Sequence, residues 1–290
     1  MQKRKRTQIF DYSKIILILQ DNNYLNIDMR FHIILRVEGS RRLLPFNYQY
    51  ELSAATYHIL ASANEEFAEW LHENGFRMDN GKQFKLFTFS RLNPEKFRIL
   101  RQSNQLELLS DKVEWQISFL PEHSTQKFVE GLFQKRVFEV SNKQSVVQFQ
   151  VDSIEMLPSP EFTDMMTFEA LSPIFVSKKL DDGRDYYPQN AEEFANAPWV
   201  RERLFKNLLD KYEAFYGKEF EGERFFEMMT LTDPKSVLVS IKANTRYETR
   251  VRGFLCRLAL HCPADLLRIA YESGLGEGNS QGFGCLGVNN

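Results

Sequence analysis

The order of strand-like and helix-like segments constrains the fold of this chain more than any single motif does. Residues 29–37 alternate apolar and polar side chains, with Phe31, Ile33 and Leu35 on one face, which is typical of a half-exposed strand. By the same criteria the next segments are predicted to be a helix, two strands, a helix and a strand, at 50–62, 82–91, 107–119, 121–135 and 137–151. The order β-α-β-β-α-β is that of a ferredoxin-like unit.

A second round of the same pattern follows Pro158 and Pro160. Its predicted elements are strand 165–177, helix 191–215, strands 223–231, 236–243 and 246–258, helix 263–273 and a last strand, which is one strand too many for the unit. We therefore predict an α+β fold of two tandem ferredoxin-like (RRM-like) domains. The predicted parts are an N-terminal extension (1–28), a first domain (29–151), a linker (152–164) and a second domain (165–290).

Composition excludes several classes of protein. A chain of 290 residues that is 43% hydrophobic has ample material for a core, and a net charge of −2 means that any polyanion must be held by a local basic patch. No apolar run approaches the length of a spanning helix. Cys256, Cys262 and Cys285 form no CxxC pair, so we expect small buried residues rather than ligands, and a reducing, cytoplasmic location.

Glycine is concentrated near the end of the chain, where five of the fourteen glycines lie between Gly274 and Gly284. A phosphate-binding glycine motif follows a strand and opens a helix. Here a helix starting near Pro263 precedes the glycines and ends at Gly274, so the negative end of its dipole faces the loop. Two interpretations remain open: a tight helix-to-strand connection, or bare amides approached closely by RNA or by the other half of the protein.

Four stretches carry a family resemblance. The loop G-L-G-E-G-N-S-Q-G-F-G resembles the glycine-rich loop of the CRISPR-associated endoribonucleases of the Cas6 family, which cut precursor CRISPR RNA within its repeats. P-F-N-Y-Q-Y-E-L-S-A-A-T-Y-H-I-L at 45–60, K-L-F-T-F-S at 85–90 and L-S-P-I-F-V at 171–176 agree in order. The likeness runs from Met29 to about Val288, and residues 1–28 lie outside the family pattern. It implies two tandem ferredoxin-like domains, as the element order does.

The resemblance also implies a site and a mechanism. Family members use no metal and no cofactor, and the 2′-hydroxyl of the RNA attacks the adjacent phosphate to leave a 2′,3′-cyclic phosphate and a 5′-hydroxyl. By position, the catalytic residues of one branch correspond to Tyr57, His72 and Lys85. The segment between His72 and Lys85 is longer than the family pattern, so Lys82 and Arg77 are alternatives for the cation.

Geometry adds a condition that these residues must meet. In one continuous helix Tyr57 and His72 would be separated by roughly 22 Å of rise and could not share a phosphate. Asn64 is a good N-cap, so we predict two helices that meet near Ala63, the second carrying His72 near its end. Without the resemblance, Tyr57 is more simply a packed aromatic and His72 a partner of the helix dipole. His58 is a rival histidine on the opposite face of the first helix.

A local basic cluster supplies the patch that the net charge lacks. Alternation along a strand would place Arg246, Arg250 and Arg252 on one face, where they could follow RNA phosphates, although a solvated edge strand would look the same. Arg30 and Arg36 are expected to extend this surface. The predicted RNA-binding residues are Lys242, Arg246, Arg250, Arg252, Gly274, Gly276, Gly278, Gly282 and Gly284.

The sequence therefore predicts a metal-independent endoribonuclease with CRISPR repeat RNA as substrate. The alternative is a noncatalytic CRISPR RNA-binding subunit of an effector complex. A third hypothesis is an unrelated ferredoxin-like RNA module with Phe87 and Phe89 as stacking platforms. Effector-complex subunits and a second copy of the chain are further candidate partners, and no membrane partner is expected.

Overall fold

The first half of the chain builds an antiparallel sheet. The structure, a computed structural model, describes residues 29–243 and 246–288. The strand order is β10-β11-β1-β9-β5, and β6 (Asn93–Pro94) also pairs with β9. The bounds are Met29–Glu38 for β1, Phe87–Phe89 for β5, Lys112–Phe119 for β9, Val137–Ser141 for β10 and Val146–Leu157 for β11. Without the edge strand β10, this is the order of a ferredoxin-like sheet.

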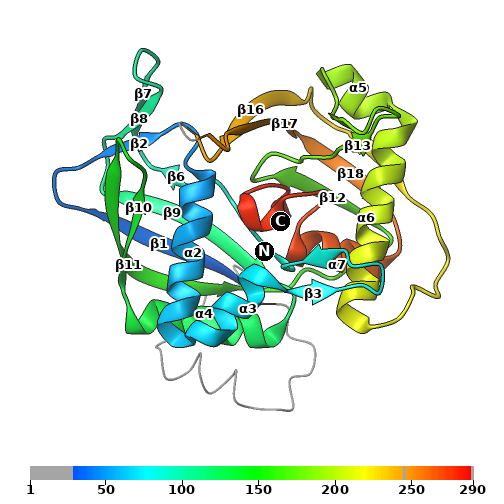
Figure 1. Ribbon diagram of the computed structural model, residues 1–290, viewed down its shortest axis with the longest axis horizontal. Helices are drawn as coiled ribbons and strands as arrows, with labels where there is room; N and C mark the ends of the chain where they lie inside the picture. The colour runs from blue at the N-terminus through cyan, green and yellow to red at the C-terminus, as the bar shows by residue number, and fades with distance from the viewer. Residues whose placement is uncertain (1–28, 244–245, 289–290) are drawn as a thin grey trace, which may run out of the picture.

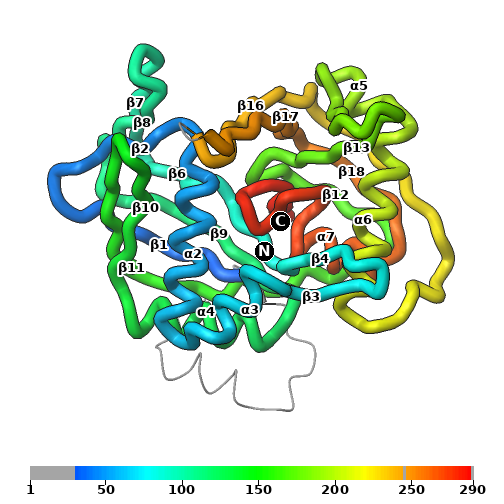
Figure 2. The backbone as a smooth tube through the Cα atoms, in the orientation of Figure 1, coloured from blue at the N-terminus to red at the C-terminus, as the bar shows by residue number. Residues whose placement is uncertain are grey.

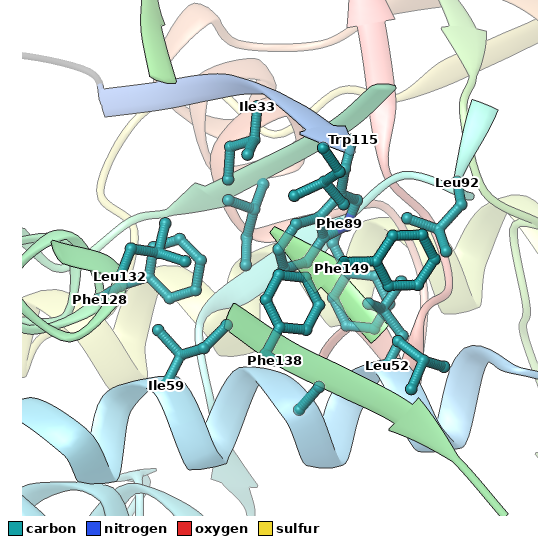
Figure 3. Packing of buried hydrophobic residues seen from close by; sticks show 14 of the residues in the cluster. Ile33, Leu52, Ile59, Phe89, Leu92, Trp115, Phe128, Leu132, Phe138 and Phe149 are labelled. Carbon is teal, nitrogen blue, oxygen red and sulfur yellow. The ribbon is translucent and has the colours of Figure 1, made fainter. Parts of the chain in front are cut away.

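Three helices accompany this sheet: α2 (Gln49–Ala63), α3 (Glu65–Glu73) and α4 (Glu122–Gln134). Figure 3 shows Leu52 and Ile59 of α2 and Phe128 of α4 packed toward aromatic side chains of the sheet. Phe87 and Phe89 belong to this core and are completely buried. The hypothesis that they form an RNA-stacking platform is therefore wrong, because strand alternation does not say which face of a sheet is covered.

The second half repeats the pattern with the strand order β15-β18-β12-β19. Its strands are β12 (Met165–Ala170), β15 (Glu227–Thr230), β18 (Arg257–His261) and β19 (Leu286–Val288), and its helices are α5 (Ala191–Asn196), α6 (Pro198–Tyr216) and α7 (Ala264–Ser273). Figure 1 shows the two halves side by side. The predicted fold class is confirmed, whereas the domain boundaries stay a prediction and residues 1–28 lie outside the described residues.

The extra strand of the second half belongs to an inserted hairpin. Strands β16 (Lys235–Ile241) and β17 (Thr249–Leu255) pair only with each other among the described strands. The predicted strand 246–258 is wrong, because the chain leaves the hairpin at Cys256 and then enters the main sheet as β18.

Several predicted strands of the first half are also divided. Segment 137–151 is a hairpin of β10 and β11 rather than one strand, and a turn at 142–145 joins the two. Segment 107–119 divides into β8 (Gln105–Leu108) and β9, and segment 82–91 into β4 (Gln83–Phe84) and β5. The remaining short strands are β2 (Leu43–Pro45), β3 (Phe76–Arg77), β7 (Phe97–Leu100), β13 (Lys178–Lys179) and β14 (Asp185–Tyr186).

A buried arginine joins the two halves. Arg30 on β1 is 2% exposed, its guanidinium donates to the carbonyl oxygens of Tyr271 and Leu286, and it lies 3.8 Å from the centre of the Tyr271 ring. The expectation that Arg30 extends an RNA-binding surface is therefore wrong. These side-chain contacts are all with the second half, so Arg30 stabilises the contact between the halves.

Two simpler expectations concern the cysteines and membrane-spanning helices. Cys256, Cys262 and Cys285 are buried and free, as predicted. Within residues 29–243 and 246–288, no helix is long and apolar enough to cross a membrane.

Candidate active site

The break between Tyr57 and His72 lies where the sequence predicted it. Helix α2 ends at Ala63 and α3 begins at Glu65, and the Asn64 side chain accepts a hydrogen bond of 2.7 Å from the Phe67 amide. This N-cap turns the chain back on itself, so that α3 returns along α2. His72 lies in the last turn of α3. The predicted pair of helices is confirmed.

As a result, the phenol and the imidazole face each other. The ring centres of Tyr57 and His72 are 5.0 Å apart at an interplanar angle of 85°. Both side chains line a pocket of about 310 Å³, and 65% of the His72 side chain is exposed. A substrate phosphate can therefore reach both groups from solvent.

The predicted cation lies in the same pocket. Lys85 lines it, and its Nζ donates a hydrogen bond of 2.6 Å to the backbone oxygen of His72. Gly75 makes this approach possible: a Cβ there would lie 2.5 Å from the Phe84 oxygen and 3.0 Å from Lys85 Cδ. Hence Tyr57, His72 and Lys85 converge, although the chain separates them.

Lys82 and Arg77, the two alternatives for the cation, bind other side chains outside the pocket. Lys82 Nζ lies 2.8 Å from Oδ2 of Asp210 on α6, and Arg77 donates to the Asn74 side chain at 2.7 Å. Neither lines the pocket. His58, which the sequence placed on the opposite face, does line it and remains a second histidine within the site.

Burial changes the acidity of two of the three groups. Burial raises the pKa of Tyr57 well above its usual value, and a side-chain hydrogen bond with Ser280 only partly opposes this shift. The phenol is therefore protonated at neutral pH and can donate a hydrogen bond to a bound group. Burial lowers the pKa of Lys85, Glu73 opposes the shift, and Arg77 adds to it. A lysine with a lowered pKa gives up its proton more readily than an exposed one.

The glycine-rich loop forms the opposite wall of the pocket. Ser280 and Gln281 in the short 3-10 helix η1 (Asn279–Gln281) line it, and the Ser53 hydroxyl of α2 donates to the Ser280 oxygen at 2.6 Å. Figure 2 shows this red segment between α2 and the second sheet. These two polar residues are not among the predicted site residues, although their place between glycines at the tip of the loop was a signal.

Most of the loop glycines are covered by protein. A Cβ at Gly276 would lie 2.3 Å from the Phe175 oxygen, one at Gly282 2.8 Å from Gln49 Cβ on α2, and one at Gly284 2.0 Å from the Leu275 oxygen. Gly274, Gly276, Gly282 and Gly284 are buried. Close packing explains their lack of side chains, and direct RNA contact at these four positions is not supported.

A buried lysine holds the loop in place. Lys211 on α6 is 2% exposed, and its Nζ donates to the oxygens of Gly274 at 2.6 Å and Gly276 at 3.3 Å and to Oδ1 of Asn279 at 2.7 Å. Asn279 Nδ2 in turn donates to the Phe283 oxygen at 3.1 Å. Burial lowers the pKa of Lys211 to about 7, with Lys82 adding to the shift and Glu277 opposing it.

The predicted basic residues gather on the inserted hairpin. Arg250 and Arg252 lie on β17, where Arg250 pairs with Glu248 at 2.9 Å and Arg252 donates to Ser236 at 2.7 Å. Lys242 and Arg246 lie in the hairpin loop beyond the ends of the strands, so Arg246 does not continue the row on β17. RNA binding by these side chains stays a prediction.

Two other features of the described residues concern alternative binding sites. A larger cavity of about 960 Å³ lies between β7 and the inserted hairpin, but it contains none of the predicted catalytic residues. Residues 29–243 and 246–288 contain no group of three or more His, Cys, Asp and Glu side chains that could hold a metal ion.

The chain resembles known proteins over most of its length. Residues 43–153 match the family described as "CRISPR-associated protein Cas6, N-terminal" and residues 157–288 match "CRISPR associated protein Cas6, C-terminal". "CRISPR-associated endoribonuclease Cas6 1" of Methanocaldococcus jannaschii is 30% identical over 263 residues, covering 89% of this chain and 92% of that protein. "CRISPR-associated endoribonuclease Cas6" of Pyrococcus furiosus is 29% identical over 265 residues, covering 90% of each.

A solved structure has the same fold over nearly the whole chain. The structure described as "An RAMP protein binding different RNA substrates" superposes with a TM-score of 0.73 at 25% identity, covering 90% of this chain and 100% of that one. Two family matches that together run from residue 43 to residue 288, and a relative of almost the same extent, lead to one conclusion. The chain belongs to the Cas6 family of CRISPR-associated proteins.

Proposed function

We propose that this protein is an endoribonuclease that cleaves precursor CRISPR RNA within its repeats. The observation that carries the proposal is the convergence of Tyr57, His72 and Lys85 in one solvent-accessible pocket. The names of the two relatives, both CRISPR-associated endoribonucleases, support the activity and the RNA class. A noncatalytic RNA-binding subunit would not require these three groups to meet.

The chemistry proposed is metal-independent transesterification. The 2′-oxygen bonds to phosphorus while the bond to the 5′-oxygen breaks, so one proton must leave the 2′-hydroxyl and another must reach the 5′-oxygen. His72 carries the proton, because an imidazole can accept the proton of the 2′-hydroxyl and donate it to the 5′-oxygen, and this side chain is exposed in the pocket. Lys85 supplies positive charge to the phosphorane, and the protonated Tyr57 phenol donates a hydrogen bond that orients the phosphate.

The test compares cleavage of the protein's own repeat RNA in excess EDTA for the wild type, His72→Ala and His261→Ala. His261 is a matched control, because it lies on β18 in the second half and is not part of the pocket lining. His72→Ala is expected to slow single-turnover cleavage by about 10²–10⁴-fold, while His261→Ala cleaves like the wild type. A 2′-deoxy sugar before the scissile phosphate should abolish cleavage and leave binding intact.

Three results would contradict the proposal. Cleavage that stops in EDTA would exclude the metal-independent mechanism, and full activity of His72→Ala would remove its central residue. Tight binding without cleavage by the wild type would favour the noncatalytic alternative. Association with effector-complex subunits or with a second copy of the chain, and a cytoplasmic location, stay predictions.

A further inference from the structure

A second pocket shares a wall with the proposed active site. It has a volume of about 400 Å³, and Tyr50 and Ala54 of α2 line both pockets. Its other walls are the turn between β10 and β11 and three residues of the inserted hairpin, Lys242, Ala243 and Tyr247. Figure 1 shows strands β16 and β17 reaching toward α2. An RNA strand with its scissile linkage beside Tyr57 can therefore reach this second pocket with a neighbouring nucleotide.

The lining combines aromatic rings with positive charge. Tyr247 of the hairpin loop is 60% exposed, and Lys242 Nζ lies 5.9 Å from the centre of its ring and 6.0 Å from that of Tyr50. The Arg246 guanidinium lies 4.6 Å from the Tyr247 ring, and Lys143 lines the pocket from the first half. Proteins bind single-stranded nucleic acid with this combination of stacking rings and cations along the backbone.

One acidic side chain decides how a nucleotide would be oriented. Glu51 lines the pocket, its Oε2 is buried without a hydrogen-bond partner among the described residues, and burial raises the pKa of its carboxyl. A carboxyl group disfavours a phosphate but can accept a hydrogen bond from the N–H edge of a base. The base would therefore point toward Glu51 and the phosphate toward the lysines.

We propose that this pocket binds the base of a single-stranded nucleotide next to the cleaved linkage, stacked on Tyr247 with its phosphate at Lys242. The inference rests on the proposed function and deepens it, because it assigns a substrate subsite to the inserted hairpin. Tyr50 belongs to one half of the chain and Tyr247 to the other. A bound base would therefore hold the hairpin against α2 while cleavage occurs.

The experiment uses a repeat RNA with a 2′-deoxy sugar at the cleavage site, which binds but is not cut. 2-Aminopurine replaces each flanking nucleotide in turn, and its fluorescence reports stacking. One position is expected to be quenched on binding. Tyr247→Ala should abolish the quenching there and weaken binding by about 5- to 150-fold, whereas Tyr247→Phe, which keeps the ring, should preserve both.

Three controls separate stacking from other effects. Tyr216→Ala, which removes an exposed tyrosine at the end of α6, should bind like the wild type. An abasic nucleotide at the quenched position should weaken binding as much as Tyr247→Ala, and the two changes together should lose no more than either alone. Lys242→Ala should reduce the dependence of binding on salt, which Tyr247→Ala should leave unchanged.

The inference fails if no flanking position is quenched, if Tyr247→Ala binds like the wild type, or if its effect persists in full with the abasic RNA. These results are distinct from a failure of the proposed function. If the wild type cleaves the natural repeat and Tyr247→Ala is indistinguishable from it, only the subsite is refuted. If the wild type does not cleave at all, the endoribonuclease is refuted first.

Discussion

Replacing Gly284 tests why the glycine-rich loop is built of glycine. Gly284 has φ +69°, and an alanine Cβ there would lie 2.0 Å from the Leu275 oxygen and 2.6 Å from Asn279 Nδ2. Gly183, in the turn between β13 and β14, has φ +82° but nothing within 4 Å of the added Cβ. The two glycines share the positive φ and differ in the space around them, so Gly183→Ala is a matched control.

The expected losses follow from these distances. Left-handed backbone costs an alanine about 1–2 kcal/mol, and this is the whole expected effect at Gly183. At Gly284 the Leu275 carbonyl must also move by about 1 Å or more, at an overpacking cost of about 1–3 kcal/mol. That movement weakens the 2.8 Å hydrogen bond from the Leu275 amide to the Gly284 oxygen, worth about 0.5–1.5 kcal/mol. Gly284→Ala should therefore lower the free energy of unfolding by about 2.5–6.5 kcal/mol.

Urea unfolding monitored by two probes measures the stability, and single-turnover cleavage measures the consequence for the site. Gly284→Ala should also slow cleavage, because the loop carries Ser280 and Gln281 into the proposed catalytic pocket. Equal stability losses for the two variants would refute the packing argument. Loss of RNA binding by Gly284→Ala without the extra loss of stability would instead show that the glycine is needed for close approach of RNA.

Three further predictions follow from the buried polar groups. Arg30→Met removes the donor to two carbonyl oxygens of the second half and should lower the free energy of unfolding, measured in urea, by about 2–4 kcal/mol. Arg36 forms an exposed ion pair on the same strand, so Arg36→Met should change this free energy by about 1 kcal/mol or less. Lys211→Met should lower the free energy of unfolding by about 2–4 kcal/mol and slow cleavage, because it removes the contacts of Lys211 with the loop. Lys206 is an exposed lysine on the same helix, and Lys206→Met should change neither quantity. Equal effects of the two substitutions would contradict the role of Lys211 in holding the loop. Above about pH 10 the unfolded chain loses the phenolic proton of Tyr57, whereas the folded protein keeps it because the pKa of this phenol is raised. The free energy of unfolding should therefore fall as the pH rises further. Urea titrations of Tyr57→Phe should show a smaller fall than those of the wild type.

Sequence patterns predicted the parts of this structure that depend on local interactions. The fold class followed from the order of the elements, and Asn64 marked the break that brings Tyr57 and His72 together. The family resemblance suggested Lys85 and left Lys82 as an alternative, because the sequence could not show that Asp210, in the other half of the chain, pairs with Lys82.

Errors occurred where the burial of a face is decided by distant parts of the chain. Alternation correctly placed Arg30 opposite Phe31, but it could not show that the second half covers this end of the strand. The same limit explains the error at Phe87 and Phe89. The hairpin of β16 and β17 was mistaken for part of a regular sheet, because alternation does not identify the partner of a strand.

Both halves of the chain form the proposed catalytic pocket, so activity should depend on the contact between them. Tyr57, His72 and Lys85 come from one half of the chain, whereas Ser280 and Gln281 come from the other. An isolated N-terminal fragment would keep all three reactive groups and still lack the wall that faces them. Mild heat or low urea that parts the halves should therefore inactivate the enzyme before either half loses its secondary structure, and fragments cut between them should regain activity only on reassociation.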